Sequence, residues 1–541
     1  MTRYQTTLGV FLVGAALLWG APLRNETQPA AAASTAAASV RDLARIRSLS
    51  VAPGNRVIIG TDGAGAYITR DDGRSWMISS IGLDDPQLTY TTFSPTFGKD
   101  ETVFATSSGH FQRSLNRGHF WQSTALHAPS WALGFRHSYA PRFVGLGRFA
   151  PEALVPSTIT PSPRFDEDQT LFLGTKRHGV YRSLDGGENL KQVWDAGGAA
   201  IVVLEVSPDY AGDKTLFGCL AARGVWRSVD GGANWSSVNR GLPIPAASAP
   251  EVTATETRTT VLAAIDQLAI SPEYSADRTV FAAGGAGLFR SVNRGDDWVP
   301  LGDDVLPQGS PIRALAVSPN YKRDSTFLVS TQLKARSPEA PAAPAGNSGS
   351  RLFRSRDGGA SFERVATPRL PSDEVLHTIR FAATYPESEK IYAASDQAIL
   401  VGVRRGRRWI PIARPVRVED TTPNVVYSGA WTKVPRSLKT SAGSVHTSGE
   451  GLAEVTFEFV GTGVTWVGSA GPDQGIAKVF LDDEHKKDVD QFAPAFRGVA
   501  TSYTISGLPR ATHSIRIVVL EDKIQSSAGV RIEIDAFDVD L

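Results

Sequence analysis

Val225–Trp235 reads VWRSVDGGANW, and the same pattern occurs five more times in the chain. The other copies are YITRDDGRSW (67–76), FQRSLNRGHFW (111–121), VYRSLDGGENL (180–190), LFRSVNRGDDW (288–298) and LFRSRDGGASF (352–362). An acid or amide stands at one fixed place in every copy, at Asp71, Asn116, Asp185, Asp230, Asn293 and Asp357. A decayed seventh copy, AILVGVRRGRRW (398–409), has lost this residue. The chain is therefore built from a repeat.

A second element precedes these motifs, as in VSPDYAGDKTLFG (206–218). Together they give four apolar pieces per unit: a strand ending in S-P, a T-x-F strand, a G-x-x-R-S strand and a strand opening with tryptophan. Four short strands in a unit of about 45 residues or more are typical of one propeller blade. We predict an all-β chain with a seven-bladed β-propeller at 41–416. Six blades stay open, because the seventh copy can share its sheet with the N-terminal strand.

The motif itself is best interpreted as the hairpin between the third and fourth strands. An Asx side chain accepts hydrogen bonds from backbone N–H groups ahead of it, and a glycine there supplies a positive φ. Asparagine in two copies supports a structural role, because an amide is a poor acid or base. Residues that recur once per blade are also assigned to the architecture, namely Arg113, Arg182, Arg227, Arg290 and Arg354, and Asp100, Asp168, Asp213, Asp277 and Asp324.

These six copies resemble the Asp-box repeats of bacterial neuraminidases. Proteins with such repeats include sialidases, xyloglucan-cleaving glycosidases, the sortilin ectodomain and photosystem II assembly factors. The resemblance implies that the box is an outer turn, remote from any catalytic face. Sialidases of this family carry an R-I-P-like motif before the first box, whereas this chain has RDLARIRSLSV (41–51) without the proline. Zinc-ligand spacing, a nucleophile elbow and a phosphate loop are absent from the sequence. We therefore favour a protein without catalysis.

Composition limits the partners and the compartment. The chain has 541 residues and a net charge of +1, which argues against nucleic acid as a partner. Its single cysteine, Cys219, lies in an apolar run and is expected to be buried and inert. Residues 1–40 are interpreted as a signal peptide or N-terminal anchor with an alanine-rich linker, because Leu8–Ala21 is apolar but short for a spanning helix. We expect a secreted, periplasmic or cell-surface protein, in contact with a membrane only if this segment is uncleaved.

Three insertions interrupt the repeat. Gln122–Thr158 concentrates aromatic and basic residues, and Trp131, Tyr139 and Arg142 are candidates for ligand or partner binding there, with a lid packed on the propeller as the alternative. Leu242–Ala264 is polar, and the segment from Lys334 is rich in proline, alanine, glycine and serine. Function is more often found where a repeat is broken than where it is kept.

Residues 417–541 form a second predicted domain, a β-sandwich. Its pattern includes VTFEFVGTGVTWVG (455–468), expected to turn at Gly461–Gly463, and a charged hairpin at Asp482–Asp483. The segments YSGAW, GIAKVFLDD, SGLPRATHSIRIVV and IEIDAFDVD resemble those of a galactose-binding-like jelly-roll module. That resemblance implies a carbohydrate-binding module in which Trp431 and Trp466 are candidate stacking platforms, although aromatic core residues are commoner. Glu533 and Asp535 are weak candidates for holding a structural Ca²⁺.

The preferred interpretation is a non-catalytic binding or scaffold protein, whose propeller binds a protein or glycan and whose C-terminal module binds carbohydrate. One alternative is a sialidase-like glycoside hydrolase with an appended carbohydrate-binding module, which requires arginine or carboxylate residues at the centre of the propeller that break the repeat. The other is an extrinsic assembly factor or subunit of a membrane protein complex.

Overall fold

The computed structural model describes residues 45–540, except 55, 74–75, 81, 84, 108, 126–153, 245–264, 304, 308–309, 333–349, 368–369, 371–373, 413–415 and 436–443. In that part of the chain every pairing between named strands is antiparallel, and the five helices have four residues each. The predicted all-β class is confirmed.

Seven four-stranded sheets lie within the described residues, each built from four consecutive strands in the order in which they occur. Their bounds are β1–β4 (Ile46–Ala52, Arg56–Thr61, Ala66–Thr69, Met77–Ile78), β5–β8 (Leu88–Phe93, Val103–Ser107, His110–Ser114, Gln122–Ala125), β9–β12 (Pro156–Pro161, Leu171–Thr175, Val180–Ser183, Lys191–Trp194), β13–β16 (Ile201–Val206, Leu216–Leu220, Gly224–Ser228, Ser236–Ser237), β17–β20 (Gln267–Ile270, Val280–Gly284, Gly287–Ser291, Val299–Leu301), β21–β24 (Ile312–Val317, Phe327–Gln332, Ser350–Ser355, Glu363–Val365) and β25–β28 (Thr378–Phe381, Ile391–Ala394, Ile399–Val403, Arg408–Ile412).

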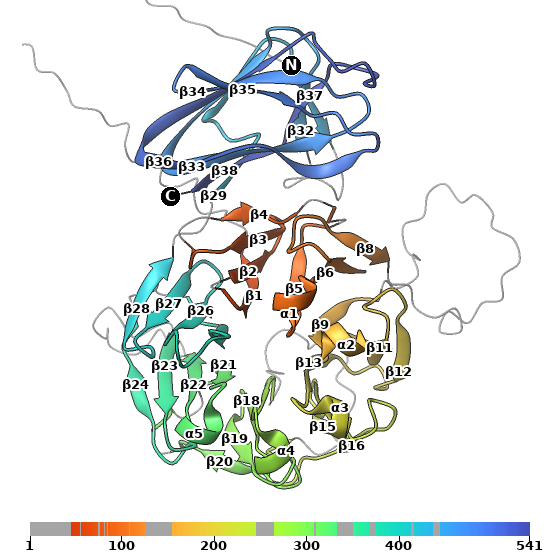
Figure 1. The fold of residues 1–541 in the computed structure, drawn as a ribbon. Coiled ribbons are helices and arrows are strands. Elements are labelled where there is room, and N and C mark those ends of the chain that lie inside the picture. Colours follow the sequence, from red (N-terminus) through yellow and green to blue (C-terminus); the bar gives the residue numbers. More distant parts are fainter. Residues whose placement is uncertain are drawn as a thin grey trace, which may run out of the picture. The chain divides into compact units, whose positions relative to one another are not determined.

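The sheets are arranged as blades around a common centre (Figure 1). The first strand of each sheet contacts the first strand of the next, and β25 contacts β1, so the series closes into a ring. At the closure, Asp72 accepts hydrogen bonds from Lys390 Nζ and Tyr392 Oη, both at 2.6 Å. Neither the first nor the last sheet borrows a strand from the other, so the sharing that a six-bladed count needed does not occur among the described residues.

Five one-turn helices join the first and second strands of sheets two to six. They are α1 (Phe97–Asp100), α2 (Phe165–Asp168), α3 (Tyr210–Asp213), α4 (Tyr274–Asp277) and α5 (Tyr321–Asp324). The aromatic residues that open α2 to α5 pack edge-on against the T-x-F phenylalanine of the preceding sheet, as Tyr210 does on Phe172 with ring centroids 5.6 Å apart. Such edge-to-face pairs add to the burial of the rings. The repeated aromatic residues therefore hold neighbouring sheets together.

The C-terminal strands form two further sheets, built from β29 (Val416–Glu419), β30 (Val425–Ser428), β31 (Thr432–Pro435), β32 (Ser444–Ser448), β33 (Glu454–Ala470), β34 (Ile476–Leu481), β35 (Glu484–Asp490), β36 (Arg497–Val519), β37 (Ile532–Ile534) and β38 (Ala536–Asp540). β31, β32 and β37 make the smaller sheet, and the other strands make the larger one. Both contribute to one apolar core, which contains Phe457, Trp466 and Ile534.

Two sequence expectations for this region can be compared with the structure. The turn expected at Gly461–Gly463 is wrong, because β33 runs through it as one strand and only its register with β36 shifts there. The expected hairpin at Asp482–Asp483 is present, and both residues have the positive φ angles (50° and 64°) of a tight two-residue turn. β29 begins at Val416, one residue before the predicted domain boundary, because Val416 pairs with Val539 of β38.

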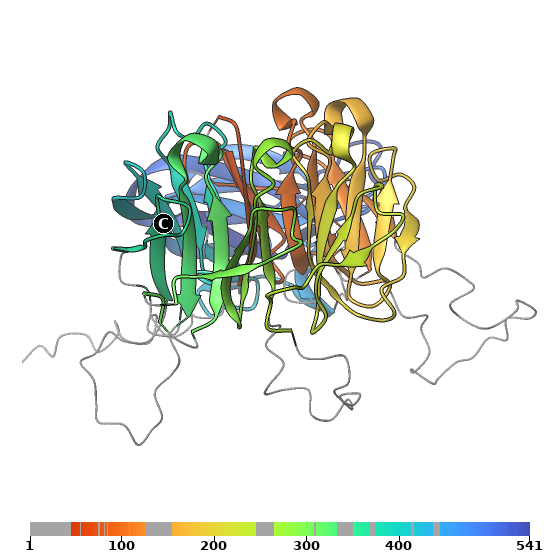
Figure 2. The same ribbon diagram turned by 90° about the horizontal axis from the view of Figure 1, so that it is seen from below.

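The ring has two distinct faces, set by strand direction. The short helices and the Asp-box hairpins lie where first strands end, on what we call the box face; Figure 2 shows the helices together on one side of the ring. First strands begin on the opposite face, which we call the insert face. The strand ends that flank 126–153, 245–264 and 333–349 all lie on the insert face, because these segments join fourth to first strands or second to third strands.

Candidate functional site

The Asp box of the fourth sheet is a closed set of hydrogen bonds. Asp230 Oδ1 accepts from Ser228 Oγ at 2.8 Å and from the Asn234 backbone N–H at 2.9 Å. Ser228 Oγ in turn accepts from the N–H of Gly232 at 2.9 Å, and Gly232 has the φ of +92° that favours glycine. The Asn234 backbone bond is the largest of several that lower the pKa of Asp230. The carboxylate is thus used within the turn.

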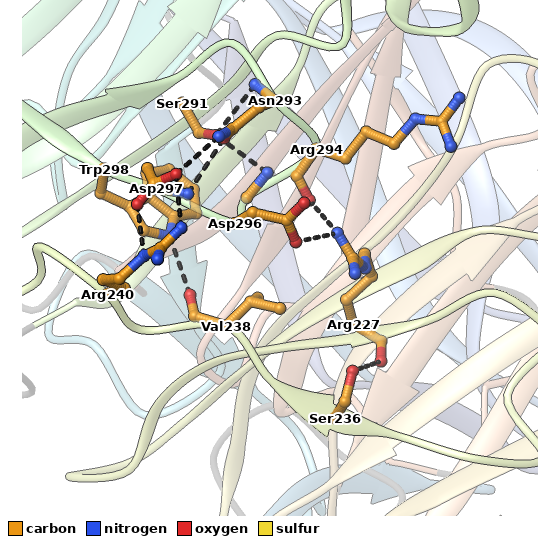
Figure 3. Close-up of polar contacts among 11 residues, drawn as sticks. Arg227, Ser236, Val238, Arg240, Ser291, Asn293, Arg294, Asp296, Asp297 and Trp298 are labelled. Carbon is orange, nitrogen blue, oxygen red and sulfur yellow. Dashed lines mark hydrogen bonds and ion pairs between the residues drawn. The ribbon is translucent and has the colours of Figure 1, made fainter.

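Asparagine makes the same contacts in the fifth sheet (Figure 3). Asn293 Oδ1 accepts from Ser291 Oγ at 2.8 Å and from the Asp297 N–H at 3.0 Å. Its Nδ2 donates to Asp297 Oδ2 at 2.8 Å, so the acid and the amide have exchanged places between the first and last residues of the turn. Trp298 Nε1 donates to the carbonyl of Val238 in the preceding sheet at 2.8 Å. This geometry agrees with the structural role that the repeat indicates for the motif.

The recurring arginines connect neighbouring blades. Arg113 Nη1 donates to the Gly186 carbonyl at 2.8 Å, Arg182 Nη1 to the Gly231 carbonyl at 3.0 Å, and Arg227 Nη1 to the Arg294 carbonyl at 2.7 Å. In each case the acceptor lies in the Asp-box turn of the next sheet. Arg290 and Arg354 make the same contact with the next hairpins. These arginines therefore belong to the architecture of the ring.

The repeat is broken at the axis. One residue of each first strand pairs with the residue of the second strand that corresponds to the T-x-F phenylalanine; in chain order these are Ser50, Thr92, Thr160, Glu205, Ala269, Ala316 and Arg380. Five of the seven are small, and only Glu205 and Arg380 are charged. Tyr90 lies two residues before this place in β5, and its large side chain also departs from the small residues of the repeat. We call Tyr90, Glu205 and Arg380 the axial cluster.

The axial cluster joins three sheets that are not neighbours in the ring. All three side chains are half-buried, and burial raises the pKa of Glu205 to about 7, although the charge of Arg380 opposes this. Burial also raises the pKa of Tyr90, while Arg380 acts on its hydroxyl through charge and a hydrogen bond. Glu205 can thus hold or release a proton near neutral pH. The sequence carried a signal for this cluster, since Glu205 lies two residues before an S-P motif where other copies have small residues.

A second broken set lies nearer the insert face: Asp266 directly precedes β17 of the fifth sheet, and Arg313 is the second residue of β21 in the sixth. Asp266 is buried enough to raise its pKa to about 6, with Arg313 at 4.0 Å as its opposing charge. Arg313 Nε also donates to Gln332 Oε1 at 2.8 Å. The described residues therefore place acidic and basic groups on this side of the ring; the equivalent positions are Thr89, Ser157 and Val202 in the second to fourth sheets, and Arg47 and His377 in the first and seventh.

A separate pocket of about 450 Å³ opens in the C-terminal domain. Its lining residues are Ala430, Thr432, Thr447, Ser448, Gly449, Glu450, Asp473, Gly529, Val530 and Arg531. They come from the facing ends of β31 and β32, the loop after β33 and the segment that leads into β37. The volume is within the range of small-ligand sites.

Polar groups of opposite charge line this pocket. Arg531 Nη2 contacts Asp473 at 3.1 Å and Glu533 at 3.1 Å, which fixes the guanidinium in the wall. Thr447 Oγ1 and Arg531 Nε are buried polar atoms without a hydrogen-bond partner among the described residues. Both atoms are buried, so they lie within the wall of the pocket, and the polar groups on its surface come from Glu450, Asp473 and the Arg531 Nη atoms.

The predicted binding residues have three different positions relative to the described structure. Trp131, Tyr139 and Arg142 lie outside the described residues. Trp466 is fully buried in the core of the C-terminal domain and donates to the Glu533 carbonyl at 3.3 Å, which is the core alternative. Trp431 is partly buried, packs on Tyr427 at 5.2 Å and stands between the two pocket residues 430 and 432.

The weak metal candidates are deeply buried. Glu533 accepts from Ser469 Oγ and pairs with Arg531, so its carboxylate is held by protein donors. Asp535 is also buried, and its backbone N–H donates to the Val467 carbonyl at 2.9 Å. Among the described residues, the structure has no group of three or more His, Cys, Asp or Glu side chains placed to hold a metal ion.

Cys219 is buried, and desolvation raises the pKa of its thiol.

Comparison with known proteins gives short sequence matches. No protein-family model matches the chain. It is 35% identical over 101 residues to an A type blood alpha-D-galactosamine galactosaminidase of Flavonifractor plautii, which is 19% of this chain and 9% of that enzyme. It is 31% identical over 103 residues to an A type blood N-acetyl-alpha-D-galactosamine deacetylase of the same organism, 19% of this chain and 13% of the enzyme. The matches thus span a small part of each relative.

Solved structures of low sequence identity also match. The GH74 xyloglucanase from Xanthomonas campestris matches with 15% identity and a TM-score of 0.47, over 76% of this chain and 58% of that one. YCF48 from Cyanidioschyzon merolae matches with 12% identity and a TM-score of 0.40, over 66% and 94%. In the described residues no helix is long and apolar enough to cross a membrane, and Leu8–Ala21 lies outside them.

Proposed function

We propose that this chain is an extracytoplasmic, non-catalytic binding protein whose C-terminal domain holds a carbohydrate in the 450 Å³ pocket. On this proposal the seven sheets are the blades of an Asp-box propeller and the C-terminal sheets are a jelly roll. The observation that carries it is the lining of the pocket, where the side chains of Glu450, Asp473 and Arg531 offer hydrogen-bond acceptors and donors together.

Carbohydrate suits this pocket for three reasons. Sugar hydroxyls donate and accept hydrogen bonds, so they match a wall that offers Glu450, Asp473 and Arg531 together. Gly449 has only Val530 Cγ2, at 3.8 Å, near the place of a Cβ, so its lack of a side chain leaves the pocket open there. Trp431 is the predicted stacking residue that follows Ala430 in the chain, although its ring packs on Tyr427. The short matches to galactosamine-processing enzymes agree with a sugar ligand.

The test is glycan-array binding followed by calorimetry on the full chain. Thr432→Val preserves the shape of an exposed lining side chain and removes its hydroxyl, and we expect it to weaken glycan binding about tenfold. Trp431→Ala tests the stacking role. Lys487→Gln, on the exposed face of β35, is the matched control and should bind like wild type. The proposal would be overturned if no glycan binds the chain, or if Thr432→Val binds glycan with wild-type affinity.

A glycoside hydrolase is the second candidate, favoured by the Glu205 carboxyl on the axis with its pKa of about 7. A raised pKa is what a general acid needs at neutral pH, but glycosidases use two facing carboxyl groups. Release of reducing sugar from any glycan, lost in Glu205→Gln, would replace the binding proposal with hydrolysis.

The location of the protein is part of the proposal. Leu8–Ala21 supports export, and Edman sequencing of the mature protein distinguishes its two versions. A start near Ser34 supports a released protein. An intact N-terminus in the membrane fraction supports an anchored one, which also fits a partner in the envelope.

A further inference from the structure

The charges around the 450 Å³ pocket of the C-terminal domain do not balance. Its charged lining residues are Glu450, Asp473 and Arg531. A further carboxylate, that of the fully buried Glu533, lies behind the lining and contacts the same guanidinium at 3.1 Å. The described wall of the pocket therefore combines three carboxylates with one cation.

The guanidinium is already engaged by two of these carboxylates. Arg531 Nη2 lies 3.2 Å from Asp473 Oδ1, 3.1 Å from Asp473 Oδ2 and 3.1 Å from Glu533 Oε1. One positive charge is thus shared between two negative ones, and this group keeps a net negative charge. Lys433 follows the lining residue Thr432 but does not line the pocket itself, because side chains alternate between the two sides of β31.

Glu450 is the carboxylate with an open acceptor. Its side chain is exposed, and Oε2 accepts from the backbone N–H of Ala430, another lining residue. This bond ties the carboxylate to the backbone beside the pocket. The described part of the chain gives Oε1 no hydrogen-bond donor and gives Glu450 no cation within 4.0 Å. A ligand group that is both a donor and a cation would meet an unshared negative charge here.

We propose, resting on the carbohydrate role proposed above, that this pocket selects sugars that carry a protonated amino group. Hydrogen bonds between a cationic donor and a carboxylate are roughly twice as strong as those of a neutral hydroxyl. An ammonium group on Glu450 also offsets the excess negative charge of the wall, which a hydroxyl at the same place leaves uncompensated. An acidic sugar brings one more negative charge to this wall and is disfavoured.

Calorimetry on the full chain, in slightly acid buffer that keeps the amine protonated, provides the test. Galactosamine is compared with galactose and glucosamine with glucose, because each pair differs only in an amine for a hydroxyl. Galacturonate is the acidic probe, and butylamine carries the charge without the sugar. We expect at least one amino sugar to bind about tenfold more tightly than its neutral parent. This preference should shrink as salt is added, since Glu450 is exposed and salt screens exposed charges.

The outcomes separate this inference from the carbohydrate role on which it rests. Equal or tighter binding of the neutral parents, or tightest binding of galacturonate, would overturn the selection for an amine and leave the carbohydrate role intact. If none of these sugars and no glycan binds, both proposals fail. Binding of butylamine as tight as that of the amino sugars would show that the sugar is not recognised, and it would also overturn both.

Variants assign the preference to the carboxylate. Glu450→Gln keeps an oxygen for the Ala430 N–H and removes the charge, so it should reduce the ratio of amino-sugar to neutral-sugar affinity about tenfold. Glu458→Gln removes an exposed carboxylate of β33 outside the pocket lining and is the matched control, with the ratio of wild type. An unchanged ratio in folded Glu450→Gln would refute the assignment. If that variant fails to fold, a wild-type preference that does not respond to salt would refute it instead.

Discussion

Arg227 extends from the fourth sheet to the fifth and donates Nη1 to the backbone carbonyl of Arg294 at 2.7 Å (Figure 3). The same Nη1 contacts Asp296 Oδ1 at 2.8 Å. The arginine thus holds the hairpin of the next sheet in place by a backbone contact that does not depend on the residue types in that hairpin. This explains why an arginine recurs while the turn varies between D-G-G and N-R-G.

Removing this arginine should destabilise the ring. We expect Arg227→Ala to lower the free energy of unfolding by about 1–3 kcal/mol, because a charge-assisted hydrogen bond is lost and a carbonyl loses its donor. Urea unfolding followed by tryptophan fluorescence measures this. Arg164→Ala removes an exposed ion pair with Glu167 and should cost at most about 1 kcal/mol. Equal effects of the two changes would contradict the role of Arg227 as an inter-blade contact.

The Asp box should tolerate an amide. Asp230→Asn keeps the Oδ1 acceptor, and the Asn234 amide can rotate to offer its oxygen, so we expect a change below about 0.5 kcal/mol in the free energy of unfolding. Asp230→Ala removes the acceptor for Ser228 and Asn234 and should cost about 1–2 kcal/mol, as the loss of a helix N-cap does. The measurement is urea unfolding of both variants. A larger loss for asparagine than for alanine would be inconsistent with the turn.

Acid should weaken the boxes that contain aspartate. Hydrogen bonds lower the pKa of Asp357 to about 2, the largest from the Ser361 hydroxyl. An aspartate in the unfolded chain has a pKa of about 3.9. A lowered folded-state pKa stabilises the fold above pH 4, and this contribution is lost as the pH falls from about 4 to 2. The urea midpoint of Asp357→Asn should therefore fall less over this interval than that of wild type, whereas Asp303→Asn, an exposed residue outside the boxes, should follow wild type.

Cys219 should be unreactive in the folded protein. Its side chain is fully buried, and Sγ donates to the Ile265 carbonyl at 2.8 Å. Burial raises the pKa of the thiol, and the thiolate is the reactive form. A disulfide reagent should label the denatured chain completely and leave the native chain unlabelled over the same time. Rapid labelling without denaturant would show that this strand opens.

Much of the ring could be predicted, because each element of the repeat makes a contact that is repeated between sheets. Two examples are the packing of Tyr210 on Phe172 and the hydrogen bond from Arg182 to the Gly231 carbonyl. Once one copy of the repeat is aligned with the others, such a contact can be expected in each of them. The turn expected at Gly461–Gly463 was wrong for the opposite reason. Glycines mark a turn only if the strand has no partner that continues past them, and β36 does continue.

The sequence alone determined the repeat and its all-β character, because these depend on the residue types within short segments. Only the tertiary structure decided which exceptions to the repeat meet. Glu205 and Arg380 are 175 positions apart and become neighbours through closure of the ring, which depends on the contact of the last sheet with the first. In the same way, folding buried Trp466 and placed Thr447 beside Arg531, since burial and pocket shape depend on strands that are distant in the chain.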